Sequence, residues 1–248
     1  MKPVVIAGYA RSPFHFANKG DLAKVRPDEL AAQVVAGLLK QTGVDTKDIE
    51  DVIVGCAFPE GEQGMNVARL ISFLAKIPLT AGAATVNRFC GSSMQAIHQA
   101  AGAIQMGAGD VFICAGVESM TRIPMGGYNF LPHPGLAKDY PEAFCSMGIT
   151  AENLAKKYQI TRKEQQELTV ISHDRAAKAR EAGKFRDEIV AISHKGGNVS
   201  DDGCIRPGTT QESLDTLKPA FLEDGSVTAA TSSPLTDGAA ATLVCSED

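Results

Sequence analysis

Two patterns of apolar positions alternate along the first half of the chain. The first is a short run that is nearly all apolar, as at 4–7, 51–56 and 111–116. The second is a longer segment with apolar residues three and four positions apart, as at 27–42, 67–76 and 92–104. Buried parallel strands give the first pattern, and one-sided helices give the second. The alternation therefore predicts an α/β protein with a mostly parallel sheet that helices cover on both faces.

Capping signals mark several predicted helix ends. Pro27 precedes two acidic residues and opens the first helix, and Gly43 closes it. Thr161 begins a capping-box pattern for a helix that ends near Gly183. Thr150 is positioned to cap a helix over 151–158. Further strands are expected at 83–86, 189–192, 225–230 and 238–244.

The alternation of strands and helices stops at residue 119. Residues 119–149 contain four prolines with several glycines and methionines, which predicts irregular structure that still buries apolar side chains. Residues 150–190 are helical in pattern and carry nine Lys and Arg against seven Asp and Glu, although the whole chain has a formal net charge of −5. This basic segment is either a solvated helical face or a surface for an anionic substrate.

Composition narrows the function classes. A chain of 248 residues with 44% hydrophobic and 21% charged residues has the balance of a globular protein, and its acidic charge argues against nucleic-acid binding. No apolar run approaches the roughly 20 residues of a membrane span, and the N-terminal run is too short for a signal peptide. The six cysteines lack metal-ligand spacing, so we expect no metal site and a reducing, cytoplasmic compartment.

Cys90 stands between a predicted strand that ends at Val86 and a helix that begins near Ser92. The first turn of a helix has unpaired N–H groups and a partial positive charge, which stabilise a thiolate and lower a thiol pKa from its free value of about 8.5. Gly91 leaves room for a substrate, and Ser92 or Ser93 is expected to cap the helix. A cysteine taken at random is more often buried and inert. The placement of Cys90 is what indicates a nucleophile.

The segment 87–97, Asn-Arg-Phe-Cys-Gly-Ser-Ser-Met-Gln-Ala-Ile, resembles the nucleophile motif of the thiolases, the acetyl-CoA acyltransferases. Four further motifs occur in the family's order and extend the resemblance over residues 4–244. They begin at Gly116 (Gly-Val-Glu-Ser-Met), Met147 (Met-Gly-Ile-Thr-Ala-Glu-Asn), Asp187 (Asp-Glu-Ile-Val) and Gly225 (Gly-Ser-Val-Thr-Ala-Ala). The resemblance implies a thiolase-like N-terminal half with a mixed, mostly parallel sheet, plus an inserted, mainly helical loop domain.

The resemblance also implies a domain organisation. Residues 1–118, continued by 225–248, would form the thiolase N-terminal domain, and residues 119–224 would form the loop domain that binds coenzyme A. Thiolases consist of two similar halves. We expect the second half, with its activating His-Pro-x-Gly histidine and second catalytic cysteine, to be absent here. His133 follows Leu-Pro but lacks the rest of that motif, so it is expected to be structural or to lie at the surface.

The implied chemistry is a reversible acyl transfer without a metal or a covalently bound cofactor. The thiolate of Cys90 would attack the keto carbon of a 3-oxoacyl-CoA, acetyl-CoA would leave, and the acyl group would pass from the cysteine to free CoA. By motif position, Arg206 matches a basic side chain at the adenine–phosphate end of CoA. Ser213 matches a residue at the adenine, Ser233 one at the pantetheine, and Met147 belongs to the same substrate site. Exposed loop residues of these types are usually only solvated.

Two departures from the family pattern bear on the direction of the reaction. Ser146 stands where biosynthetic thiolases carry a histidine, and residues 230–234 replace the usual Gly-Asn-Ala-Ser-Gly. Both favour a degradative 3-ketoacyl-CoA thiolase of fatty-acid β-oxidation over an acetoacetyl-CoA-forming thiolase.

Three alternatives stay open from the sequence. They are the acetoacetyl-CoA-forming thiolase, a non-catalytic CoA-binding half that complements a second chain, and a condensing enzyme of the ketoacyl-synthase type. For the chain alone we expect negligible turnover, because the activating groups belong to the second half. We also expect a homo-oligomer, a dimer or a tetramer, because an edge strand of the sheet seeks a partner.

Overall fold

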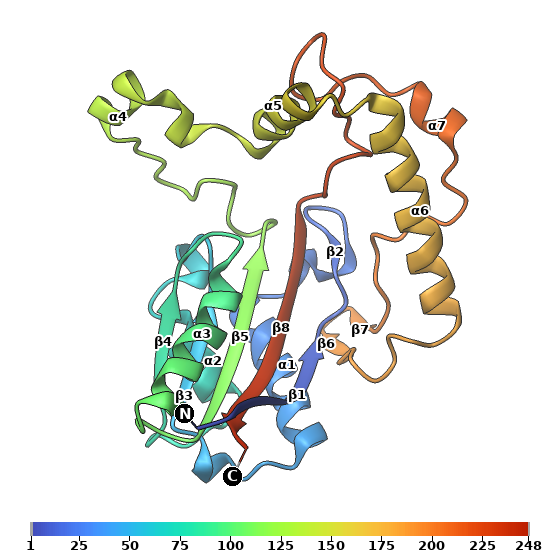
Figure 1. Ribbon diagram of the computed structural model, residues 1–248. Helices are drawn as coiled ribbons and strands as arrows, with labels where there is room; N and C mark the ends of the chain where they lie inside the picture. Colours follow the sequence, from blue (N-terminus) through green and yellow to red (C-terminus); the bar gives the residue numbers. More distant parts are fainter. Residues whose placement is uncertain (1, 248) are drawn as a thin grey trace. The chain divides into compact units, whose positions relative to one another are not determined.

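The main sheet has six strands, and its principal path runs β1-β8-β5-β3-β4, with β2 paired to β8 (Figure 1). The strands are β1 (Val4–Arg11), β2 (His15–Phe16), β3 (Asp51–Gly55), β4 (Gly82–Val86), β5 (Val111–Ser119) and β8 (Thr236–Ser246). β3 runs parallel to β4 and β5, whereas β8 runs antiparallel to β1 and β5. Four strands of the path therefore share one direction, which confirms the predicted mixed, mostly parallel sheet.

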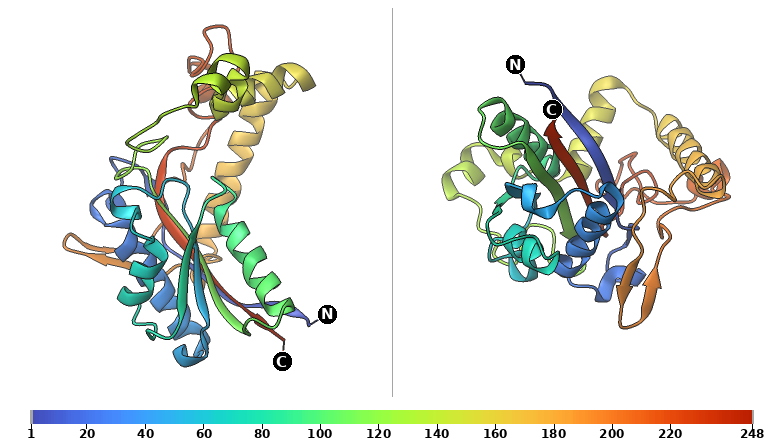
Figure 2. Two further views of the ribbon diagram at one scale, coloured as in Figure 1. Left: turned by 90° about the vertical axis from the view of Figure 1, so that its left-hand side faces the viewer. Right: turned by 90° about the horizontal axis from the view of Figure 1, so that it is seen from below.

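Three helices cover the two faces of this sheet: α1 (Pro27–Thr42), α2 (Val67–Leu74) and α3 (Ser92–Gln105). The edge-on view in Figure 2 shows α1 and α2 on one side of the strands and α3 on the other. The alternation of side chains along β3 explains this, because Val52 and Val54 pack in the α1–α2 core and Ile53 packs in the α3 core. The prediction of helices on both faces is confirmed.

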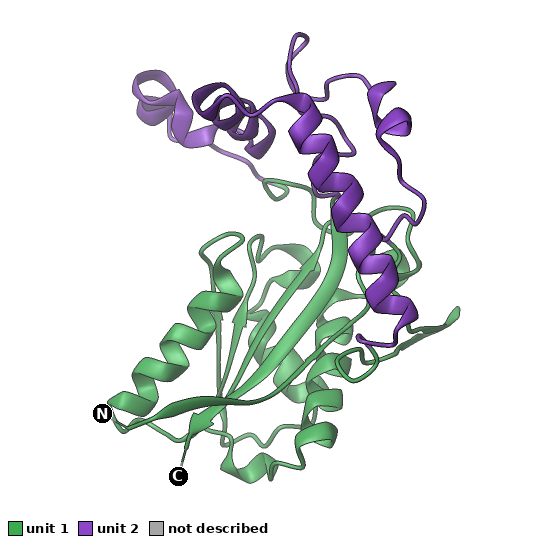
Figure 3. Ribbon diagram, turned by 45° about the vertical axis from the view of Figure 1, so that its right-hand side comes forward, with its two compact units in different colours: residues 1–128, 186–203, 235–248 green, residues 129–185, 204–234 purple. Residues whose placement is uncertain are grey.

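The structure describes residues 2–247, which group into two units (Figure 3). Unit 1 holds the main sheet, the hairpin β6 (Ile192–His194) and β7 (Gly197–Val199), and three short 3₁₀ helices at 21–24, 46–48 and 61–63. Unit 2 comprises residues 129–185 and 204–234. Its helices are α4 (Pro134–Asp139), α5 (Met147–Tyr158), α6 (Arg162–Glu181) and α7 (Gln211–Asp215), with a 3₁₀ turn at 141–144. Unit 2 is therefore mainly helical.

Two segments expected in the inserted domain group with unit 1, namely 119–128 and 186–203. Polar contacts account for both. Asp237 accepts hydrogen bonds from Thr121 beyond the end of β5. Arg11, at the end of β1, forms ion pairs with Glu188 and Asp202. The role of unit 2 as a CoA-binding domain stays a prediction.

Several local predictions are confirmed and others are wrong. Gly43 closes α1 in the left-handed conformation, and Thr161 forms a capping box on α6. Thr150 does not cap its helix, because α5 begins earlier and Ser146 accepts the capping hydrogen bond from Ile149. The predicted strand at 225–230 is absent from the described structure, where only a single bridge, Pro219 to Thr228, occurs.

Candidate active site

Cys90 lies in a tight turn that joins β4 to α3, and its side chain is exposed. The preceding residue, Phe89, has φ of 45°, a left-handed conformation that costs a non-glycine residue on the order of 1 kcal/mol. The turn is held by its own hydrogen bonds: Arg88 N–H donates to Ser92 Oγ at 2.8 Å, and Phe89 N–H donates to Asn87 Oδ1 at 2.8 Å. The thiol is thus presented on a hydrogen-bonded turn at the start of a helix.

The predicted serine cap of α3 is wrong. Gly91 occupies the N-cap position without a side-chain capping bond, and Ser92 is the first helical residue. The Ser92 hydroxyl donates to the carbonyl of Phe89 at 2.5 Å while accepting from Arg88. Ser92 therefore stabilises the turn that precedes the helix, and its side chain does not cap the N–H groups of the first helical turn.

A buried polar network lies beside this turn, between β3 and the end of β5. Glu118 accepts hydrogen bonds from Ala57 N–H at 2.8 Å and from Gln63 Nε2 at 2.7 Å. Gln63 is fully buried and its Oε1 accepts from Ser119 N–H at 2.7 Å. Ser119 Oγ in turn donates to the buried Asp237 at 2.9 Å. The network ties the loop after β3 to β5 and β8.

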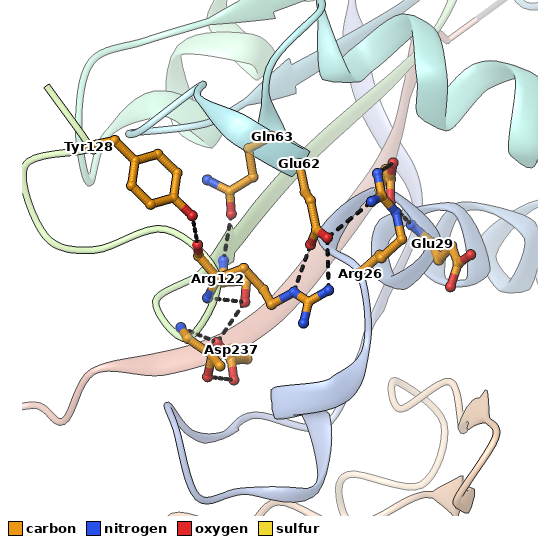
Figure 4. Close-up of polar contacts among 10 residues, drawn as sticks. Arg26, Glu29, Glu62, Gln63, Arg122, Tyr128 and Asp237 are labelled. Atoms are coloured by element: carbon orange, nitrogen blue, oxygen red, sulfur yellow. Dashed lines mark hydrogen bonds and ion pairs between the residues drawn. The ribbon is translucent and has the colours of Figure 1, made fainter.

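A second group of charged residues extends this network toward α1 (Figure 4). Glu62 accepts from Arg26 Nη1 at 3.0 Å and from Arg122 Nε at 2.7 Å, so one carboxylate joins two guanidinium groups. The hydroxyl of Tyr128 donates to the carbonyl of Arg122. These contacts fix the segment that follows β5 within unit 1.

The buried cysteines of unit 1 differ sharply from Cys90. Burial, with the nearby Glu118 carboxylate as a smaller cause, raises the pKa of Cys56 to about 12. Burial, and then Asp51, raises the pKa of Cys114 to about 12. Both thiols stay protonated at neutral pH and are inert. Of these three cysteines, only Cys90 is exposed for nucleophilic chemistry.

Unit 2 contains a cavity of about 200 Å³ beside α6 and α7. Two of the residues predicted to bind CoA, Arg206 and Ser213, line it together. The remaining lining residues are Thr169, His173, Thr209, Leu214, Leu217 and Ala230. The cavity has a cation, hydroxyl groups and apolar walls, which suits a ligand that carries both a phosphate and a flat ring.

His173 is a residue of this cavity that the sequence motifs did not indicate. Its Nδ1 accepts a hydrogen bond from Arg206 N–H at 3.3 Å, so the neutral ring carries its proton on Nε2. Burial, and then the positive charge of Arg206, lower the pKa of His173 below its ordinary 6.5. The ring is therefore neutral at pH 7. The one signal in the sequence that could have pointed to His173 is its spacing from Thr169. The two residues are four positions apart on α6, so they lie on the same face of the helix.

The other two predicted substrate residues lie elsewhere in unit 2. Met147 is the first residue of α5 and is exposed, and Ser233 is exposed in the irregular segment before β8. Neither lines the cavity of Arg206 and Ser213. Cys90 belongs to unit 1 and all four of these residues belong to unit 2. Their grouping in one substrate site stays a prediction.

Within residues 2–247, no cluster of three or more His, Cys, Asp or Glu side chains is arranged to hold a metal ion. None of the helices in the same range combines the length and the apolar character that crossing a membrane requires. His133 caps α4, where its Nδ1 accepts from Leu136 N–H at 3.3 Å, as expected of a structural histidine.

The mixed sheet and the exposed cysteine at the junction of β4 and α3 place the chain among α/β proteins whose candidate site lies at the carboxyl end of a strand. The sequence profile described as "Thiolase, N-terminal domain" matches residues 4–248. The chain therefore belongs to the thiolase family.

Curated relatives carry the name 3-ketoacyl-CoA thiolase. The relative from Bacillus subtilis (strain 168) is 47% identical over 257 residues, which cover 98% of this chain and 66% of the relative. Relatives from Shewanella sp. (strain ANA-3) and Shewanella loihica are each 48% identical, over all of this chain and 65% and 66% of their own lengths. The chain thus spans about two thirds of the length of these relatives.

Proposed function

We propose that this chain supplies the cysteine nucleophile of an acyl-CoA thiolase, an acyltransferase that cleaves 3-oxoacyl-CoA with CoA. The observation that carries the proposal is the exposed Cys90 on a strained turn at the start of α3. Relatives named 3-ketoacyl-CoA thiolase support the same substrate class, the CoA thioesters.

In the proposed reaction, the ionised sulfur of Cys90 forms a bond to the keto carbon of the substrate. The bond between the α-carbon and the keto carbon then breaks, and its electron pair leaves with the α-carbon. That carbon takes up one proton and departs as acetyl-CoA, which balances the proton lost by the thiol. The thiol of free CoA next attacks the acyl thioester, releases the shortened acyl-CoA and returns Cys90 to its thiol form. N–H groups at the first turn of α3 are suited to stabilise the oxyanion.

We further propose that unit 2 holds CoA, with Arg206 and Ser213 at its nucleotide end and with Met147 and Ser233 along its length. The cavity shared by Arg206 and Ser213 supports this assignment. Ser146 and the segment 230–234 favour the degradative direction, as in fatty-acid β-oxidation, over formation of acetoacetyl-CoA. We place the activity in the cytoplasm. We also propose that the protein is a homo-oligomer, because β4 is an edge strand at the end of the sheet and is open to pairing with another chain.

Acyl transfer to the protein tests the proposal directly. After incubation with acetyl-CoA, intact-mass analysis should find one acetyl group per chain, and peptide mapping should place it on Cys90. Cys90→Ala should abolish the adduct, and Cys145→Ala, which removes a partly exposed thiol from unit 2, should leave it unchanged. Acetylation spread over several thiols, or none at all, would contradict a nucleophilic Cys90.

Turnover by the chain alone should be negligible. None of its five histidines lies in a complete His-Pro-x-Gly-x-Ser-Gly motif, and general-base assistance is worth about 10²–10⁴ in rate. A coupled thiolysis assay on the purified 248-residue chain measures this. Normal thiolase turnover would show that a residue of this chain activates Cys90.

A further inference from the structure

We propose that Glu118, acting through Gln63 and Ala57, is the positioning residue of the Cys90 turn. The proposal deepens the thiolase function proposed above and rests on it, because it concerns the same nucleophile. Glu118 lies at the end of β5 and does not itself touch the sulfur. Its effect passes through the loop 57–63 that follows β3.

Glu118 fixes this loop at both ends. Its Oε2 accepts from Ala57 N–H at 2.8 Å, and its Oε1 accepts from Gln63 Nε2 at 2.7 Å. Gln63 Nε2 also donates to the carbonyl of Phe58 at 2.9 Å, and Gln63 Oε1 accepts from Ser119 N–H at 2.7 Å. Because Gln63 is fully buried, water cannot replace any of these bonds when it is lost. The carboxylate therefore holds both ends of the loop.

The fixed loop touches the Cys90 turn at two places. Asn87 Nδ2 donates to the carbonyl of Ala57 at 3.0 Å, and the rings of Phe58 and Phe89 lie 6.2 Å apart at 55°. Asn87 uses its other amide atom, Oδ1, to accept from Phe89 N–H at 2.8 Å. A continuous chain of contacts thus runs from Glu118 through Ala57 and Asn87 to the residue before Cys90.

The turn needs such support because its own residues are exposed. Asn87, Phe89 and Cys90 are all exposed, so burial does not fix them, yet Phe89 adopts the left-handed conformation with φ of 45°. A strained backbone persists only where its surroundings over-determine it. The Glu118 chain supplies that support from the buried side. It keeps the sulfur of Cys90 at the first turn of α3, whose N–H groups carry a partial positive charge.

Glu118→Gln tests the proposal on the full chain. The amide brings a new donor against either Ala57 N–H or the Gln63 amide group, so one of the two loop contacts is lost. The readout is the rate at which iodoacetamide modifies Cys90, followed by peptide mass spectrometry, with Cys145 in the same molecules as reference. We expect a fall of about two- to fivefold, the size of the interaction between a helix N-terminus and a nearby negative charge. Hydrogen exchange at residues 87–92 should rise with it.

Two further variants separate positioning from a general loss of structure. Glu60→Gln changes a carboxylate on the same loop that accepts from Tyr128 N–H at 2.6 Å but has no contact leading to Asn87, so the Cys90 rate should not change. Asn87→Ala cuts the same chain from its exposed side and should lower the rate even if Glu118→Gln does not fold.

A folded Glu118→Gln or Asn87→Ala protein with the unaltered Cys90 rate and unaltered exchange would overturn the proposal. The proposal would also be overturned if Glu60→Gln lowered the alkylation rate of Cys90 as much as Glu118→Gln does. The two proposals fail in different ways. If the unaltered chain takes no acetyl group from acetyl-CoA while Glu118→Gln still slows alkylation, the thiolase function is wrong and the positioning role stands.

Discussion

Gly55 and Gly116 are paired across the parallel strands β3 and β5, and the first turn of α3 lies directly on both. A Cβ atom on Gly55 would stand 2.3 Å from the backbone nitrogen of Ser93, and one on Gly116 would stand 2.8 Å from Ser93 Cβ. Real atoms do not approach so closely. The absence of these two side chains therefore lets the start of α3, and Cys90 before it, lie at the carboxyl end of the sheet.

Gly55→Ala should destabilise the protein by about 1–3 kcal/mol, because the new methyl group meets backbone that cannot turn away. The same displacement of the first turn of α3 should slow alkylation of Cys90. Urea unfolding and timed iodoacetamide labelling measure the two effects.

Gly102→Ala is the matched control for this substitution. Gly102 is an exposed residue of α3 with nothing within 4 Å of its added Cβ, so alanine should stabilise the helix by about 0.5–1 kcal/mol. The rate at which iodoacetamide alkylates Cys90 should not change. Equal effects of the two alanines would mean that close packing at Gly55 has no role in placing Cys90.

The pattern of apolar residues was sufficient to predict the sheet, its covering helices and the junction of Cys90, because those depend on local periodicity and burial. It was insufficient for the contacts that hold the junction. Glu118 and Gln63 lie 55 residues apart, and their pairing depends on β3 and β5 being neighbours in the sheet. No local pattern carries that information.

Unit 2 illustrates the same limit. Two motifs noted in the sequence, which begin at Met147 and Gly225, meet through Glu152. Its carboxylate accepts from Ser226 N–H at 3.0 Å and from Val227 N–H at 2.8 Å. The small, apolar and β-branched residues of 225–230 predict a strand, but the N–H groups of Ser226 and Val227 bond to this carboxylate, and that of Thr228 bonds to the hydroxyl of Thr231. The cavity residue His173 was missed because only the folded chain brings it to Arg206.

The stability of the protein should fall with rising pH above about pH 9 because of Cys56 and Cys114. Their pKa values are raised to about 12 in the folded chain, so between about pH 9 and 12 the unfolded chain has lost protons that the folded chain retains. Unfolding is then favoured by up to about 1.4 kcal/mol per pH unit for each thiol. Below pH 9 both states hold the proton and the effect vanishes. Urea unfolding at pH 8, 9.5 and 10.5 measures this slope.

In Cys114→Ala, the free energy of unfolding should fall less steeply between pH 9.5 and 10.5, because one of the two buried thiols is gone. The part of the slope that the two thiols cause should be about halved, whatever the substitution costs in stability at pH 8. An unaltered slope in Cys114→Ala would show that this thiol ionises as readily in the folded chain as in the unfolded one.

Arg206→Ala should weaken CoA binding about five- to tenfold, the size expected when one charged contact to a phosphate is lost. The loss should be smaller for CoA without its 3′-phosphate if Arg206 contacts that group. Calorimetric titration of the purified chain with both ligands measures the difference. Arg175→Ala removes an exposed arginine of α6 that does not line the cavity, so it should not alter either affinity. Equal losses of CoA affinity in Arg206→Ala and Arg175→Ala would show that Arg206 contributes only through the overall positive charge of the surface.

The ion pair between Arg11 and Asp202 should contribute most to holding the segment 186–203 in place. The guanidinium donates to both carboxylate oxygens, at 2.8 and 2.9 Å, and Phe14 N–H donates to the same group at 2.9 Å. Burial alone would raise the pKa of Asp202, but the hydrogen bonds from Arg11 and Phe14 outweigh it and the pKa lies below its ordinary 3.8. A lowered carboxyl pKa means that this group stabilises the folded chain above about pH 4 and that the benefit is lost as the pH falls through the folded value.

Asp202→Asn should therefore cost about 2 kcal/mol at pH 7, since the amide has one acceptor oxygen where the carboxylate has two. The variant should also lose less stability than the unaltered chain between pH 5 and 3, because it has no carboxylate to protonate. Asp187→Asn changes an exposed carboxylate of the same segment and should affect neither quantity. Hydrogen exchange should rise in residues 186–203 of Asp202→Asn while the α1–α2 core stays protected. If exchange instead rises equally throughout unit 1, Asp202 supports the whole sheet and not one segment of it.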